Sequence, residues 1–278
     1  MASYAMAIDA AHCVGCMTCV VACQMHNALR PGVAWLRVDA LERGAWPQAD
    51  RIYLPHACLN CDDAPCAGVC PTGASFVGDD GLASIDYARC IGCGVCVAAC
   101  PYGARSVNAR DAWFYDAVEP APYETADPAR LGVAEKCGFC AERRARGLEP
   151  ACVAACPCEV RAFGDLDDPA DPVCAFIART GAERVEGTST FYAVGGRDFD
   201  AGAGAAELGK RASAAHETRQ DAKAQVNPTV LVTASVLGAA AASGIALTAR
   251  RDRLKRRAQA GGGGAAATPT PDDPTPEA

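Results

Sequence analysis

Cysteine is the residue type most able to do chemistry in this chain, because 18 of its 278 residues are cysteines. Thiolate sulfur binds iron and zinc tightly and also takes part in redox reactions. Most of these cysteines form four groups of four, and four variants of one spacing make an internal repeat. In chain order, the groups are Cys13, Cys16, Cys19 and Cys23; Cys58, Cys61, Cys66 and Cys70; Cys90, Cys93, Cys96 and Cys100; and Cys137, Cys140, Cys152 and Cys156.

The first and third groups have the spacing C-x2-C-x2-C-x3-C, and the second and fourth have extra residues before the third cysteine. This is the spacing of bacterial ferredoxins, in which the first three thiolates bind one [4Fe–4S] cluster and the fourth binds another. A proline follows the fourth cysteine at Pro71, Pro101 and Pro157, and keeps the chain from folding back. Each run therefore needs a partner run, so the sequence predicts two partner pairs and four [4Fe–4S] clusters.

Two other uses of these thiols compete with this interpretation. Zinc sites also use C-x2-C pairs, although they rarely contain a triple at this spacing, and zinc would make the chain an interaction module without a redox role. A disulfide framework is typical of short secreted proteins. The start of the chain, MASYAMAIDAAHC, has neither the basic nor the apolar part of a secretion signal, so we expect the thiols to meet metal first.

Four residues near the cysteine groups have less defined roles. Cys158 and Cys174 have no place in the repeat, and we expect Cys174 to be a small buried residue of an apolar helix. Arg105 and Arg161 each lie five residues after a fourth-position cysteine. Their positive charges would raise the reduction potential of a nearby cluster, and the alternative is that both are solvated at the surface.

Charge and composition limit the kinds of function. The chain has 26 basic and 33 acidic residues, for a net charge of −7, which makes nucleic-acid binding a poor interpretation. We find no acid–base pair and no activated nucleophile in the pattern of residues. The chain is therefore expected to transfer electrons without catalysing a reaction by itself.

Short elements must position the cysteines, and we expect a loop-rich α+β fold. It would consist of two ferredoxin-like modules that hold the four clusters, followed by a single C-terminal helix. Helices are expected at Val20–Leu29 and, with Asp171 as its N-cap, at Pro172–Arg179. Strand-like runs bounded by Gly, Pro and Asp cover Trp35–Leu41, Arg51–Leu54, Leu82–Asp86 and Val160–Phe163.

The C-terminal part has a different character. We expect the cluster domain at residues 1–195, a linker at 196–227, a transmembrane helix at 228–249, and a basic and then disordered tail at 250–278. For the segment from residue 196, which is rich in Ala, Gly and charge, an exposed helix is the alternative. Thr229–Ala249 contains 21 uncharged residues, which as a helix would span about 31 Å, close to the thickness of a bilayer core. The alternative is a soluble alanine-rich helix.

The basic cluster RRDRLKRR follows this apolar segment directly. By the positive-inside rule it faces the cytoplasm, so a single span would place the cluster domain on the extracytoplasmic face of the cytoplasmic membrane. The cytoplasmic face is the alternative.

The cysteine stretches resemble those of the iron–sulfur (beta) electron-transfer subunits of molybdopterin oxidoreductases, the family of dimethyl sulfoxide reductase, polysulfide reductase and formate dehydrogenase. The resemblance covers about residues 4–195. The matching stretches are HCVGCMTCVVACQMHN, CLNCDDAPCAGVCPTGA, DYARCIGCGVCVAACPYGAR and KCGFCAERRARGLEPACVAACP.

The resemblance implies that runs one and four are partners, and that runs two and three are partners. The implied ligands are set 1 (Cys13, Cys16, Cys19 and Cys156), set 2 (Cys137, Cys140, Cys152 and Cys23), set 3 (Cys58, Cys61, Cys66 and Cys100) and set 4 (Cys90, Cys93, Cys96 and Cys70).

The implied function is to relay electrons through four [4Fe–4S] clusters. The implied partners are a molybdopterin-containing catalytic subunit and an integral membrane subunit that interacts with quinone. Some members of the family have one C-terminal membrane anchor, which matches the apolar segment here. The alternative function is that of the iron–sulfur subunit of a membrane-bound hydrogenase.

Overall fold

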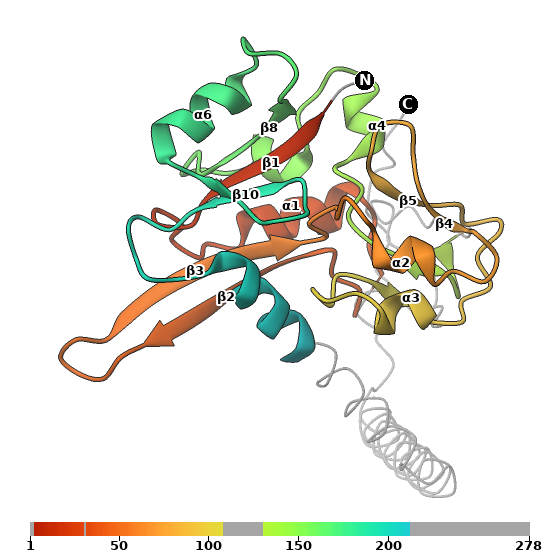
Figure 1. Ribbon diagram of the computed structural model, residues 1–278, viewed down its shortest axis with the longest axis horizontal. Helices are drawn as coiled ribbons and strands as arrows, with labels where there is room; N and C mark the ends of the chain where they lie inside the picture. Colours follow the sequence, from red (N-terminus) through yellow and green to blue (C-terminus); the bar gives the residue numbers. More distant parts are fainter. Residues whose placement is uncertain (1–2, 31, 108–129, 212–278) are drawn as a thin grey trace, which may run out of the picture. The chain divides into compact units, whose positions relative to one another are not determined.

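The computed structural model describes residues 3–30, 32–107 and 130–211, and Figure 1 shows their helices and strands. The predicted transmembrane helix at residues 228–249 and the tail after it lie outside these ranges. Within the described ranges, no helix is both long enough and apolar enough to cross a membrane. The predicted loop-rich α+β character is confirmed, since short helices and small sheets alternate along the chain.

A four-stranded sheet joins the first strand of the described chain to strands from residues 161–193 (Figure 1). The first strand lies between two strands from the last part of the domain, parallel to β10 and antiparallel to β8. Its sequence YAMAID has four consecutive buried residues, as expected for a strand covered on both faces. The order across the sheet is β8 (Arg161–Asp165), β1 (Tyr4–Asp9), β10 (Thr190–Ala193) and β9 (Glu183–Arg184).

Helix α6 (Pro172–Thr180) covers one face of this sheet. It begins as the sequence predicts, because the Asp171 carboxylate accepts a hydrogen bond of 2.9 Å from the backbone N–H of Val173. Val173 and Phe176 point at the sheet and are buried together with Ala7 of β1. This small apolar cluster leaves the other face of the sheet free to line the cysteine loops.

A long hairpin and a helix form the opposite part of the core. Strands β2 (Leu36–Arg43) and β3 (Asp50–Ala57) are antiparallel, and both correspond to predicted strands. Residues 201–211 are helical, although we expected a linker from residue 196. Their small and apolar side chains pack into the core that also holds Leu54 of β3, so this segment belongs to the folded domain.

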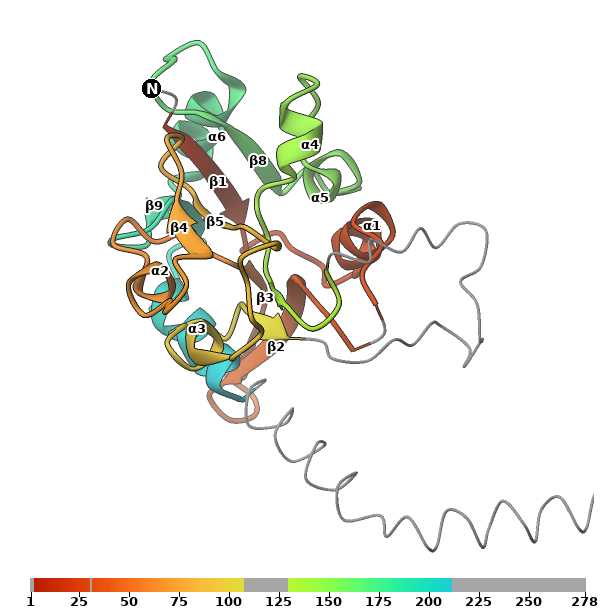
Figure 2. The same ribbon diagram turned by 90° about the vertical axis from the view of Figure 1, so that its right-hand side faces the viewer.

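The cysteine runs contribute very short helices, and these pack in pairs. Figures 1 and 2 show α2 beside α3, and α1 packs against α5. Run one is thus joined to run four, and run two to run three, as two ferredoxin-like modules require. The helices are α1 (Thr18–His26), α2 (Pro65–Gly68), α3 (Val95–Ala98), α4 (Ala141–Arg144) and α5 (Ala151–Ala154).

Two small antiparallel pairs complete the second module. β4 and β5 form a hairpin after run two, and β6 pairs with β7 across the segment that separates runs three and four. The predicted strands at Leu82–Asp86 and Val160–Phe163 correspond to β5 and β8. The pairs consist of β4 (Ser75–Val77) with β5 (Ala83–Ile85), and β6 (Ser106–Val107) with β7 (Ala134–Glu135).

Candidate metal centres

One backbone geometry recurs in all four cysteine runs. In each run the third cysteine is the second residue of a short helix, and its side chain is buried. The fourth cysteine follows about one helical turn later. The third cysteines are Cys19 of α1, Cys66 of α2, Cys96 of α3 and Cys152 of α5.

The loop between the first and second cysteines also has a fixed shape. The residue just before the second cysteine has a left-handed backbone conformation in every run, with φ of 68° at Gly15, 51° at Asn60, 67° at Gly92 and 52° at Phe139. This conformation is unfavourable for a residue as bulky as phenylalanine. The same conformation recurs at this position in all four runs, although the residue there differs. The runs therefore share a loop shape, which curls around their thiols.

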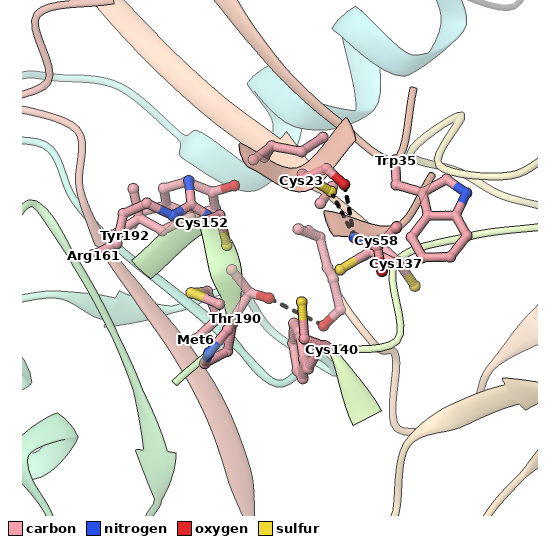
Figure 3. Close-up of a pocket in the computed structure, with 17 residues that line it drawn as sticks. Met6, Cys23, Trp35, Cys58, Cys137, Cys140, Cys152, Arg161, Thr190 and Tyr192 are labelled. Carbon is pink, nitrogen blue, oxygen red and sulfur yellow. Dashed lines mark hydrogen bonds between the residues drawn. The ribbon is translucent and has the colours of Figure 1, made fainter. Parts of the chain in front are cut away.

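The first pocket lies between run four and run one, and all four thiols of set 2 line it (Figure 3). Its other walls are mostly apolar and include residues of β1, β2 and β10. Burial raises the pKa of Cys23, and it raises the pKa of Cys137 to about 12. Such thiols stay protonated at neutral pH unless a bound metal displaces their protons.

A second pocket is lined by all four thiols of set 4, which come from runs two and three. The fourth cysteine of run two, Cys70, accepts a hydrogen bond of 3.3 Å from the backbone N–H of Ser75. This bond lowers the pKa of Cys70 to about 7, because it stabilises the thiolate.

The thiols of set 1 lie close enough to influence each other's charge. Burial raises the pKa of both Cys13 and Cys19, and the nearby thiol of Cys156 raises each further. Cys156 comes from run four, whereas the other three members come from run one. Cys16 is exposed, and the hydroxyl of Thr18 lowers its pKa through a hydrogen bond of 3.4 Å to the sulfur.

Set 3 combines three thiols of run two with one of run three. Burial raises the pKa of Cys61 to about 12, and the neighbouring thiols Cys58, Cys100 and Cys66 contribute to the increase. The backbone N–H of Ala104 donates a hydrogen bond of 3.4 Å to the Cys100 sulfur. The structure therefore brings together the four thiols of every set, and their roles as iron ligands stay predictions.

The surroundings of the thiols fit a negatively charged iron–sulfur group. Backbone N–H groups point at sulfur in several places, including a bond of 3.4 Å from Ala134 to Cys90, and such bonds stabilise thiolate and cluster sulfur. The side-chain amide of Asn27 adds a bond of 3.5 Å to Cys23. All eighteen cysteines are described, and none of them forms a disulfide. Among the described residues, no three His, Cys, Asp or Glu side chains converge on a point where one metal ion could bind, whereas in a [4Fe–4S] cluster each thiolate binds a separate iron atom.

Both arginines noted in the sequence are buried, so the alternative of solvated surface residues is wrong. Arg105 is 4% exposed and Arg161 is 6% exposed. Arg105 lies in the pocket of set 4, and Arg161 lies in the pocket of set 2 beside Cys152 (Figure 3). All three guanidinium nitrogens of Arg105, and Nε and Nη1 of Arg161, have no hydrogen-bond partner among the described residues. A negatively charged group in each pocket would satisfy them.

Sequence reasoning missed two polar residues near the cysteine sets: Asn27, which lines the pocket of set 2, and Lys136, which donates a hydrogen bond to the carbonyl of Cys137. Asn27 lies one helical turn beyond Cys23, and Lys136 directly precedes Cys137, so proximity to the runs was the available signal. The two remaining cysteines lie apart from the sets: Cys158 is exposed, and the Cys174 sulfur contacts the carbonyl of Asp168 at 3.5 Å.

Three family models match the chain. Two of them describe a 4Fe-4S dicluster domain and match residues 12–74 and 105–166. The third describes a 4Fe-4S binding domain and matches residues 83–106. The matches together cover all four cysteine runs, so the cofactors are [4Fe–4S] clusters.

Curated relatives agree with one another in the type of subunit. A putative dimethyl sulfoxide reductase iron-sulfur subunit of Halobacterium salinarum is 39% identical over 213 residues, which cover 69% of this chain and 79% of the relative. The arsenate respiratory reductase iron-sulfur subunit of Shewanella sp. is 38% identical, with 62% of this chain and 86% of the relative covered. The thiosulfate reductase electron transfer subunit of Salmonella typhi is 38% identical, with 59% and 77% covered.

These relatives give no support to the alternative of a hydrogenase subunit. The type of these relatives agrees with the four cysteine runs, the pairing of the runs and the pockets that their thiols line. The chain belongs to the iron–sulfur electron-transfer subunits of the molybdopterin oxidoreductase family.

Proposed function

We propose that this non-catalytic subunit holds four [4Fe–4S] clusters and relays single electrons through them. The partners at the two ends would be a molybdopterin-containing catalytic subunit and a membrane-bound subunit on the quinone side. The observation that supports this most is the gathering of the cysteines into four sets, each with three thiols from one run and one from its partner run. Bound clusters would supply the one-electron redox chemistry, and the protein supplies ligands, charge and shielding from water.

The order of the sets supports a single row. Thiols of sets 1 and 2 influence each other at Cys19 and Cys152. Cys58 of set 3 lines the pocket of set 2. Set 4 reaches set 3 through Cys96 and Cys66. The order is therefore 1, 2, 3, 4.

The ends of this row lie near the surface. Only two of the sixteen thiols in the sets are exposed, Cys16 of set 1 and Cys93 of set 4. Exposed apolar side chains flank each of them, including Met17 next to Cys16 and Ile91 near Cys93. Exposed apolar groups around a redox centre suit contact with a partner protein, so sets 1 and 4 are the natural places for electrons to enter and leave.

Metal analysis and spectroscopy on the anaerobically purified complex test the number and type of clusters. We expect about sixteen iron atoms and as many acid-labile sulfides per chain, since each of the four clusters contains about four of each. Visible absorption should bleach with dithionite, and a molybdenum-containing large subunit should co-purify. Bound zinc with little iron, or iron for fewer than four clusters, would contradict the proposal.

We also propose that Thr229–Ala249 anchors the chain in the cytoplasmic membrane, with the cluster domain on the extracytoplasmic face. The uncharged segment and the basic cluster that follows it support this orientation. Protease treatment of spheroplasts should digest the cluster domain while leaving cytoplasmic marker proteins intact. A cluster domain that is digested only after lysis would contradict the orientation.

A further inference from the structure

Three buried cations lie beside the cysteine sets, and their places relative to the sets suggest a common role. Arg161 and Arg105 are described above, and Lys136 is also buried, with 4% of its surface exposed. A buried charge without a counter-ion is strongly unfavourable, so each of these residues requires a compensating negative charge nearby.

Arg161 lies between sets 1 and 2. Its side chain lines the pocket of set 2, and Cys152 is one of its neighbours there (Figure 3). The thiols of both Cys152 and Cys19 lie close enough to interact with its charge. Cys19 belongs to set 1, and Arg161 also lies near Cys13 of the same set. One guanidinium thus faces two sets.

Lys136 lies between sets 2 and 3. Its Nζ donates hydrogen bonds to the carbonyl oxygen of Cys137 at 2.7 Å and to Oδ1 of Asn60 at 3.3 Å. Cys137 is a member of set 2, and Asn60 directly precedes Cys61 of set 3. Both of these acceptors are uncharged, so neither neutralises the ammonium group.

Arg105 lies at set 4, beside the thiol through which set 4 approaches set 3. It lines the pocket of set 4 together with Cys96, the member of this set that lies close to Cys66 of set 3. The residue before it, Ala104, donates its backbone N–H to the sulfur of Cys100, which belongs to set 3. Each of the three junctions in the row therefore has one buried cation.

We propose that Arg161, Lys136 and Arg105 act as shared counter-charges, each of which raises the reduction potentials of the two clusters on either side of it. This inference rests on the proposed four-cluster function. A cluster becomes more negative when it accepts an electron, so a fixed positive charge in a buried site stabilises its reduced form. A charge between two clusters also weakens the repulsion that a reduced cluster exerts on its neighbour. These are positioning charges rather than catalytic residues.

Redox titration followed by EPR on the holo complex tests the proposal at Arg161. We expect Arg161→Gln to shift two midpoint potentials downward, those of the clusters of sets 1 and 2, and to leave the other two in place. Arg161→Lys keeps the charge and should restore both midpoints. Arg179→Gln is the matched control, because Arg179 is exposed on α6 and should change no midpoint.

Four unchanged midpoints in Arg161→Gln would overturn the proposal, and so would a shift of one cluster alone or an equal shift in Arg161→Lys. If Arg161→Gln fails to assemble clusters, two other variants test the proposal. Lys136→Gln should lower the midpoint potentials of the clusters of sets 2 and 3, and Arg105→Gln should lower those of sets 3 and 4. Unshifted midpoints in these two variants would overturn it equally. Wild-type protein with fewer than four clusters would instead contradict the proposed function.

Discussion

Removal of the Cys156 thiol gives the most direct test of how the runs share their clusters. The Cys156 side chain lies near Cys13 and Cys19 of run one, whereas the other thiols of its own run line the pocket of set 2. Cys156→Ala should therefore damage the N-terminal cluster and spare the cluster next to it in sequence. Alanine is the better replacement, because a serine oxygen is able to bind iron in place of sulfur.

The expected size of the effect follows from the shared ligands. One lost cluster corresponds to about four of about sixteen iron atoms. Cys156→Ala combined with Cys16→Ala should lose no more than either single change, because both ligands belong to set 1. Cys156→Ala combined with Cys140→Ala should lose about eight iron atoms, because these ligands belong to different sets.

Iron analysis and EPR of the reduced protein provide the measurement. The spectrum lost in Cys156→Ala should match the one lost in Cys16→Ala. Cys158→Ala is the matched control, since this exposed neighbour belongs to no set and its removal should leave the iron content unchanged. A Cys156→Ala spectrum that lacks the same signal as Cys140→Ala would show that run four is closed on itself and that the pairing is wrong.

Three further predictions concern the stability of the domain, measured by chemical unfolding. Leu54→Ala should lower the free energy of unfolding by about 2–5 kcal/mol, because this side chain is fully buried in the main core. Asp171→Ala should cost about 1–2 kcal/mol, because its carboxylate accepts backbone hydrogen bonds at the start of α6 and from β8. Gly209→Ala should cost about 1–3 kcal/mol, because a Cβ there would lie 2.2 Å from the backbone of Tyr102, whereas Gly68→Ala, with open space around it, should have little effect.

The cysteine spacing and the turn residues were sufficient to predict much of the local structure. All four strand-like runs are strands, and α6 begins at the predicted N-cap, because these elements depend on short-range signals. Helix α1 begins at Thr18, two residues earlier than predicted. The third cysteine of the run, Cys19, already lies in its first turn.

Other elements could not be predicted from local signals. Strand β1 is buried on both faces and so shows no alternation, and its partners β8 and β10 are distant in sequence. Residues 201–211 are rich in Ala, Gly and charge and look like a linker. Their small residues nevertheless allow close packing, since Gly209 packs directly against the backbone of Gly103. The sequence also did not decide whether Arg105 and Arg161 are buried, because a charged residue is expected at the surface unless its counter-charge is known.

The place of β1 in the sheet has a consequence for the order of events during synthesis. This strand is translated before the other described elements, whereas the strands on both sides of it, β8 and β10, are translated only near the end of the cluster domain. Until then its apolar residues and its backbone have no partner, and such long-range pairing is slow and prone to aggregation. Under the proposed pairing, the cluster begun at Cys13 also waits for Cys156. Iron insertion at the first cysteine of the chain is then one of the last steps in its maturation.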